Sequence, residues 1–314
     1  MIKQFNFYDI YGYLLPGVAF LGLLWLPIGI ASRSWPEQDI SKALFLAALS
    51  YFAGHILQTI ASVAVPSQVM RDTAKRPRFP SDRLLDKTFP NFGTDLKVKL
   101  ASQVQSKFGI DLRLAEDGDG TAEVSRNRNT AFFQARSYLI AQKTAHYVEQ
   151  FQGLYAMMRG LSAAFLAGTF YLAGWSFACH GSHIWMQRMF AAFAILGTVT
   201  GIVSSCIALS RNSTRSKMAT VILSGSLLVA FLGIGFWVAI SQPSDFWKHA
   251  LPHSEPTLWF CAGLTIIAAA RCFSSYQSFA IQFAQSVWRD FSVYITLQDV
   301  SGPEGDGESE KNED

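Results

Sequence analysis

Two polar residues in a long apolar stretch, His55 and Gln58, stand one helical turn apart. On one helix face they could line a polar path through a membrane or bind another subunit. They could also form a hydrogen bond between helices that only fixes packing, a contribution that averages well under about 2 kcal/mol. Arg271 is the charged side chain that we expect nearest to a membrane, where an anchor in the headgroups is favoured over a gating or substrate charge. His55, Gln58 and Arg271 are therefore the candidate intramembrane polar site.

A basic cluster follows the second long apolar stretch. It contains Arg71, Lys75, Arg76, Arg78 and Arg83. Such clusters attract anionic lipid headgroups, with each charge worth about 1 kcal/mol near the surface. The same charges could hold a nucleotide or an oligonucleotide backbone. Lipid contact is favoured, and the cluster is a candidate anion or lipid contact.

Familiar catalytic and metal motifs are missing from the sequence. Asp117–Gly120 with Glu123 is similar to a calcium loop, but the EF-hand order of ligands is not met. His146 and Glu149 lie one turn apart, yet no second histidine completes a metal motif. Neither common glycine-rich phosphate loop is present. We therefore expect no enzyme, no catalytic residue, no cofactor and no metal.

The elements that would position these residues are membrane helices. Half of the 314 residues are hydrophobic and only 16% are charged, which is too apolar for an ordinary soluble domain. A bilayer crossing needs about 20 apolar residues. Six stretches without charge approach or exceed that length: 10–32, 43–70, 160–187, 189–210, 219–244 and 256–270. The last is the shortest, and it can still span if Arg271 reaches the headgroups.

Loop charges predict the orientation of these six spans. The short loop from Arg211 to Lys217 carries three positive charges and no negative one. Positive residues favour the cytoplasmic side of short loops. With six spans, both termini and the 66–158 insertion lie on the same side of the membrane as this loop. All of them are therefore expected to be cytoplasmic.

The insertion is expected to be mostly helical. Its start, Arg71–Pro90, is punctuated by prolines and should be irregular. Thr94 or Asp95 can cap a helix that Gly109 ends. From about Asn129 the helical pattern continues without an obvious stop into the third span, and the sixth span continues in the same way to Ile295.

The chain is thus an all-α polytopic membrane protein with about six spans and a helical cytoplasmic insertion between spans 2 and 3. The expected segments are 1–65 with an interfacial lead and spans 1–2, 66–158 as the insertion, 159–275 with spans 3–6, 276–300 as a cytoplasmic helix, and 301–314 as a disordered acidic tail.

Three segments carry a resemblance to a known group. The start, Phe7–Gly17 (FYDIYGYLLPG), Gly54-His55, and Phe151–Arg159 together resemble a group of small bacterial membrane proteins, some encoded beside phage-defence genes. The resemblance implies a defence or stress context and carries over no catalytic residue, and the expected location is the bacterial inner membrane.

The expected function is a non-enzymatic, homo-oligomeric pore or membrane effector that is gated through its cytoplasmic part. Membrane lipids are expected partners, with a cytoplasmic protein or a nucleotide as candidate ligands. A small-solute transporter is the alternative, although no Asp or Glu lies within any expected span. A scaffold that anchors a cytoplasmic partner is the third interpretation.

Overall fold

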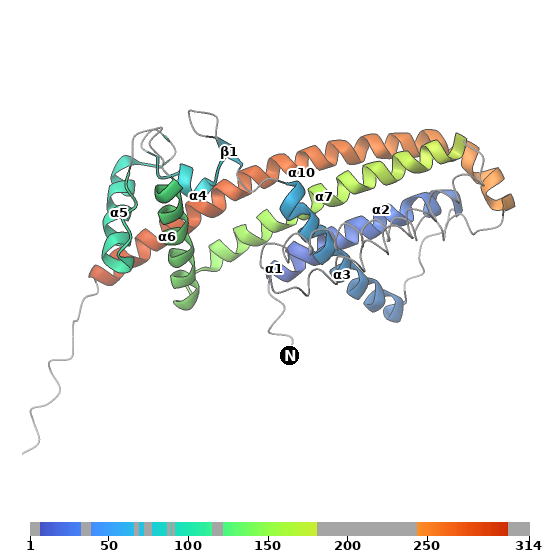
Figure 1. Ribbon diagram of the computed structural model, residues 1–314. Helices are drawn as coiled ribbons and strands as arrows, with labels where there is room; N and C mark the ends of the chain where they lie inside the picture. Colours follow the sequence, from blue (N-terminus) through green and yellow to red (C-terminus); the bar gives the residue numbers. More distant parts are fainter. Residues whose placement is uncertain are drawn as a thin grey trace, which may run out of the picture. The chain divides into compact units, whose positions relative to one another are not determined.

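A computed structural model describes residues 7–32, 39–65, 69–71, 77–86, 89, 92–114, 122–180 and 244–300. Within these ranges every element longer than two residues is a helix (Figure 1). In chain order the elements are α1 (Phe7–Asp9), the π-helix η2 (Ile10–Leu14), α2 (Leu15–Ser32), α3 (Ile40–Ala64), β1 (Met70–Arg71), β2 (Pro77–Arg78), α4 (Pro80–Arg83), α5 (Thr94–Phe108), α6 (Ala122–Ala141), α7 (His146–His180) and α10 (Ser244–Val300).

The chain divides into two compact units. Unit 1 comprises Met1–Pro66 and Gly153–Gln277, and unit 2 comprises Ser67–Gln152 and Ser278–Asp314. Two helices, α7 and α10, contribute residues to both units.

Four helical stretches are long and apolar enough to cross a bilayer. They are Ile10–Ile30, Ile40–Ser62, Tyr147–Ser176 and Pro256–Val300, with 21, 23, 30 and 45 residues. Each exceeds or matches the roughly 20 residues that a crossing requires. The all-helical class agrees with the sequence, and these four stretches have the length and composition expected of membrane spans. The expected spans at 189–210 and 219–244 lie outside the described residues, so the total of six remains a prediction.

Pro16 explains the π-helix that precedes α2. In an α-helix its position would donate to the Gly12 carbonyl, but proline has no N–H and its ring crowds that carbonyl. The backbone widens instead, and Leu15 N donates to Ile10 O, five residues back. The sequence predicts a kink or a helix start at Pro16-Gly17. Helix geometry in fact begins earlier, at Phe7, and passes through a π-turn.

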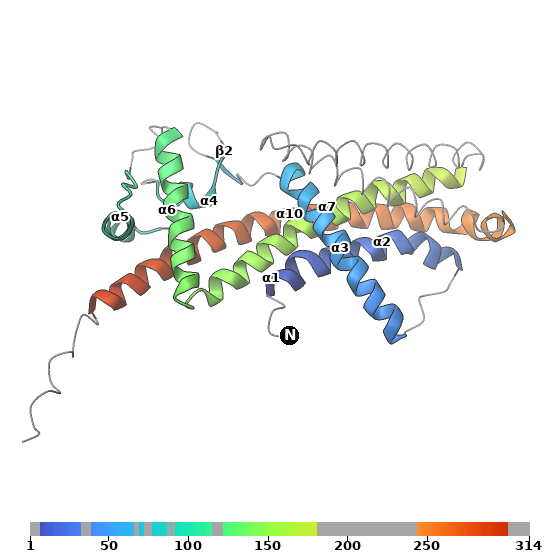
Figure 2. The same ribbon diagram turned by 60° about the horizontal axis from the view of Figure 1, so that its bottom comes forward.

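Unit 1 packs its helices through small residues and a few apolar anchors. Figures 1 and 2 both show α3 crossing α2. Phe20, Ala53, Leu57 and Ala164 form a buried cluster from α2, α3 and α7. A second cluster joins Leu23 of α2, Tyr171, Leu172 and Trp175 of α7, and Leu258 and Ala262 of α10.

Hydrogen bonds also join helices within unit 1. Tyr171 Oη donates to Leu24 O at 3.0 Å, and Ser162 Oγ donates to Ala269 O at 3.2 Å. Polar contacts of this kind fix helix pairs where the surroundings are as apolar as the helices themselves.

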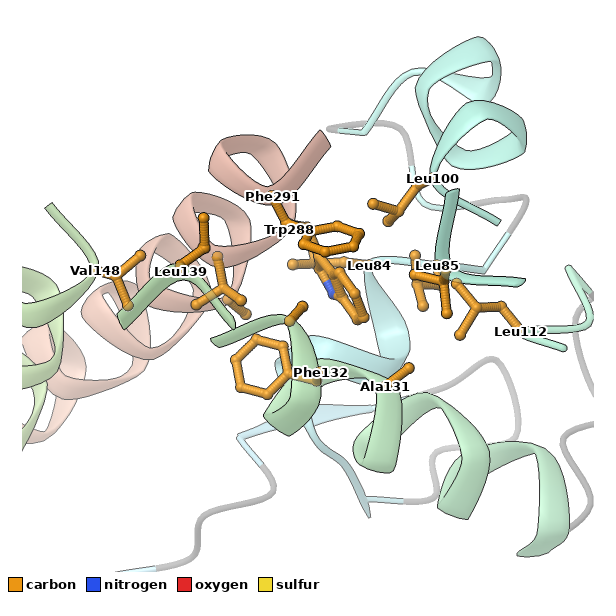
Figure 3. Close-up of a cluster of buried hydrophobic side chains, with 14 of the residues drawn as sticks. Leu84, Leu85, Leu100, Leu112, Ala131, Phe132, Leu139, Val148, Trp288 and Phe291 are labelled. Atoms are coloured by element: carbon orange, nitrogen blue, oxygen red, sulfur yellow. The ribbon is translucent and has the colours of Figure 1, made fainter. Parts of the chain in front are cut away.

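Unit 2 has an aromatic core. Trp288 is fully buried, and its ring centroid lies 5.5 Å from that of Phe132. Figure 3 shows Trp288 surrounded by Leu84, Phe132 and Phe291. The Trp288 indole N–H donates to Ser81 O at 3.1 Å, so the one polar atom of the ring is satisfied.

The predicted helix in the insertion is confirmed as α5. Gly109 ends it in the left-handed conformation, with φ 69°, as expected. The N-cap is Gly93, so Thr94 and Asp95 lie in the first turn and neither is the cap. Arg71–Pro90 is less irregular than predicted, because Met70 and Arg71 pair antiparallel with Arg78 and Pro77, and α4 follows.

The predicted unbroken helix from Asn129 into the third span is wrong. α6 ends at Ala141 and α7 begins at His146. Lys143 adopts φ 57°, Thr144 N donates to Leu139 O, and Lys143 N donates to Ile140 O. These bonds form a Schellman motif, which normally has glycine at the left-handed position. The prediction that the sixth span continues as a helix to Ile295 is confirmed, because α10 runs without interruption to Val300.

Candidate functional site: a helix junction at Gln58

The Gln58 side chain joins three helical segments of unit 1. Its Nε2 donates to Gly12 O of η2 at 2.7 Å and to Ala156 O of α7 at 2.5 Å. Its Oε1 accepts from Arg159 Nε at 3.3 Å and from Arg159 Nη2 at 3.1 Å. Two carbonyl acceptors on one side and a guanidinium on the other fix the orientation of the amide.

The junction compensates for a defect that the sequence creates. Gly12 O lacks its usual helical donor because residue 16 is proline. A buried carbonyl without a donor costs about 1–3 kcal/mol. Gln58 is only 6% exposed and supplies this donor. The polar residue in the second expected span is therefore paired with the proline in the first.

Close backbone approach makes the junction possible. A Cβ on Gly54 would overlap the carbonyl of Tyr13. A Cβ on Gly160 would lie 2.7 Å from Gln58 Nε2 and 2.8 Å from Pro16 Cγ. Side chains at either position would push the helices apart, as small-residue interfaces between membrane helices imply.

Arg159 is the residue of this site that the sequence analysis missed. Its guanidinium lies 5.5 Å from the centre of the Tyr155 ring in addition to its contact with Gln58. The Tyr155 hydroxyl lies 3.4 Å from that of Tyr276 on α10. Arg159 immediately precedes a charge-free stretch, so it was assigned to the boundary of a span. No local signal in the sequence singles it out, because its partner Gln58 is 101 residues away.

His55 is one turn from Gln58 but has different surroundings. Its ring stacks on Tyr13, with centroids 3.8 Å apart and an angle of 17° between the planes. Tyr51 packs edge-on against it at 4.7 Å. The Asp9 carboxylate interacts with the Tyr51 hydroxyl and electrostatically with His55. His55 is exposed at the surface of unit 1, whereas Gln58 is buried.

Arg271 does not join the other two residues of the candidate intramembrane site. It is exposed on α10 and makes no hydrogen bond or ion pair with any residue of the described ranges. Among the described residues, the single polar site expected from His55, Gln58 and Arg271 is therefore two separate features: a closed junction at Gln58 with an aromatic cluster beside it, and an exposed cation at Arg271.

The basic cluster is partly used within unit 2. Arg78 pairs with Asp82 at 2.9 Å, and Arg83 pairs with Asp86 at 2.6 Å. The backbone of Arg71 belongs to β1, and Lys75 and Arg76 lie outside the described residues. Two of the five charges thus have carboxylate partners and are less available to an external anion.

Arg128 completes this charge group from α6. It is 1% exposed, and its Nη1 lies 3.0 Å from Asp82 Oδ1 and 2.7 Å from Asp86 Oδ1. Nε and Nη2 donate to Leu112 O and Arg113 O. A buried charge needs both ionic and hydrogen-bonded partners, and Arg128 has both. Nothing in the sequence distinguished it from the exposed basic residues nearby.

The described residues contain no group of three or more His, Cys, Asp or Glu that could hold a metal ion. Comparisons with protein-family models, with curated proteins and with solved structures find no match for the chain. What the Gln58 junction can do chemically is to lock helices together and to hold a guanidinium beside two tyrosines.

Proposed function

We propose that the chain is a non-enzymatic pore or membrane effector of the bacterial inner membrane, assembled from several copies and gated through unit 2. One observation carries the proposal. α10 extends from Ser244 to Val300 without a break, and its residues belong to both units. A continuous helix transmits a rotation or a shift along its length, because its backbone hydrogen bonds resist bending.

The exposed apolar side chains of unit 1 support a lipid environment. Phe45 of α3, Phe170 of α7 and Phe260 of α10 are 68%, 71% and 65% exposed. Large apolar side chains exposed in this number on three long apolar helices are what lipid-facing helices present. Lipid tails or neighbouring copies would cover it.

The proposal includes cytoplasmic termini and a cytoplasmic unit 2. The three positive charges in the sequence from Arg211 to Lys217, with no negative charge among them, support this orientation. Arg271 then acts as an anchor whose stem lies along α10. The resemblance of the Phe7–Gly17 segment to bacterial proteins beside phage-defence genes supports a role in defence, with membrane permeabilisation as the effect.

Planar-bilayer recording of the purified full chain tests the proposal. Discrete conductance steps are expected, and the R271A variant should insert with the same conductance because an anchor does not line the pore. A protein that inserts but conducts nothing would overturn the proposal. Uptake of a labelled solute without conductance would indicate a transporter, and recovery of one stoichiometric soluble partner without conductance would indicate a scaffold.

A further inference from the structure

Unit 2 contains a hollow of about 370 Å³ between α5 and the last turns of α10. This volume lies within the range of small-molecule sites, about 300–1,000 Å³. The side chains that line it include Ser102, Gln103, Ser106 and Lys107 from α5 and Asp299 from α10. The proposed function assigned no role to any of them.

Gln103 has an unmet hydrogen-bonding requirement at this hollow. The residue is 7% exposed, and its Nε2 donates to Ser292 O and to Thr296 Oγ1, both at 3.2 Å. Its Oε1 is buried and accepts no hydrogen bond from any residue in the described part of the chain. The Thr296 hydroxyl donates to Ser292 O at 2.7 Å, so its proton cannot serve Gln103. This oxygen has almost no accessible surface, so a donor on a bound molecule reaches it only when the amide moves toward the hollow.

The charged side chains at the hollow define the rest of the ligand. Lys107 Nζ lies 4.9 Å from the centre of the Tyr138 ring, which restrains the ammonium group. Asp299 carries the opposite charge on α10. The exposed hydroxyl of Ser102 donates to Lys99 O and can only accept from a ligand, whereas that of Ser106 can donate or accept. The set therefore provides a cation for an anionic group and acceptors for N–H donors.

We propose that this hollow binds a small anionic molecule that also carries N–H donors. The anionic group would lie against Lys107 and the N–H donors against Gln103 Oε1 and Asp299. α-Amino acids and nucleoside monophosphates share this chemistry. Only one part of the inference rests on the proposed function, namely that the bound ligand is the signal that acts on α10. Binding itself can be measured without conductance.

Isothermal titration of the detergent-solubilised full chain tests the site with two sets of probes at millimolar concentration. One set holds acidic and neutral α-amino acids, and the other holds the four nucleoside monophosphates. Inorganic phosphate serves as a probe that has the anion without the N–H donors. Saturable binding is expected for one set, with phosphate weaker by at least about tenfold.

Three variants locate the binding. K107Q should weaken it by at least about tenfold, because an exposed lysine can be replaced without loss of folding. Q103L removes the buried acceptor and should weaken it by a similar factor. K99Q removes an exposed charge from the same helix outside the hollow and should leave the affinity unchanged. Absence of binding by both probe sets, or equal binding by wild type and K107Q, would overturn the site.

Failure of this inference can be separated from failure of the proposed function. A chain that conducts in planar bilayers but binds neither probe set overturns the ligand site alone. A chain that binds a probe through Lys107 but never conducts overturns the pore and leaves the site in place.

Discussion

Gln58 Nε2 donates a 2.7 Å hydrogen bond to Gly12 O, the carbonyl that Pro16 leaves without a helical donor. The two residues are 46 positions apart and belong to helical segments that cross. The proline in one segment thus requires the glutamine in the other. This relation explains why a buried amide lies within an apolar helix.

Replacing Gln58 by leucine should destabilise unit 1. The change leaves Gly12 O without a donor and removes the acceptor of Arg159. We expect a loss of about 1–3 kcal/mol, more than the ~0.6 kcal/mol of an average membrane hydrogen bond, because several groups lose partners together. Unfolding in graded detergent mixtures measures it. The matched control is T59V, which removes only a hydroxyl that donates to His55 O on the same helix. Equal losses in the two variants would contradict the role given to Gln58.

Alanine at Gly54 should separate two helices. Its Cβ would overlap the backbone carbonyl of Tyr13, which cannot move as a flexible side chain can. Overpacking of this kind costs about 1–3 kcal/mol or more. G22A is the control, because a Cβ there meets nothing within 4 Å. That variant should be neutral or stabilised by up to about 1 kcal/mol. Thermal unfolding of both variants in one detergent gives the comparison, and a stable G54A would show that the contact is looser than described.

Loss of the buried guanidinium should strongly destabilise unit 2. R128M removes the cation that Asp82 and Asp86 share, so that Arg78 and Arg83 are the cations left beside them, and the side chain of Asp82 is only 1% exposed. The carbonyls of Leu112 and Arg113 lose their donor as well. Breaking a buried pair in this way costs about 3–5 kcal/mol. R289Q removes a cation that is 60% exposed and pairs with its neighbour Asp290, so it should change stability by less than about 1 kcal/mol. Limited proteolysis of unit 2 distinguishes the variants. Protection of R128M equal to that of R289Q would argue against the buried charge group.

The start of α3 should loosen in acid. Asp39 caps the helix, and its bonds to the hydroxyl and the backbone N–H of Ser41 hold the pKa of its carboxyl below the ordinary value of 3.8. A lowered folded-state pKa means that the capping stabilisation is fully present above 3.8 and is lost as the pH falls through the lower value. Hydrogen-exchange protection factors for the first turn of α3 should therefore drop in that acid window. Asparagine caps without titrating, so D39N should show no such drop. A pH dependence shared by both forms would assign it to another group.

The sequence was most informative where one local rule controls the structure. The glycine at position 109 correctly predicted where α5 ends, because glycine readily adopts the left-handed conformation that terminates a helix. The helical pattern that continues to Ile295 predicted that α10 would extend past its apolar stretch, and Val287 and Phe291 on that extension lie in the core of unit 2. Length and lack of charge predicted the four helical stretches that can cross a bilayer.

The sequence was least informative where distant residues decide. The helix break after Ala141 places Lys143 in the left-handed conformation. A glycine at this position would have indicated the break in the sequence, but a lysine does not. Arg128 and Arg159 resemble ordinary surface cations in the sequence, and only their partners 42 and 101 residues away show that both are structural. His55 and Gln58 are three residues apart, which suggests one helix face. This spacing still leaves about 60° between the two side chains around the helix axis, and in the structure His55 is exposed whereas Gln58 is buried.

The division between the units within α10 offers the most direct test of gating. Ser278 is the first residue of the α10 segment that belongs to unit 2, and it is exposed. S278P interrupts the helix there at a cost of about 3 kcal/mol, whereas S278A keeps it intact. In planar-bilayer recordings, wild type and S278A should show the same open probability, and S278P should differ from both by at least about tenfold while keeping the same unit conductance. Indistinguishable gating in all three proteins would contradict control of the pore through α10.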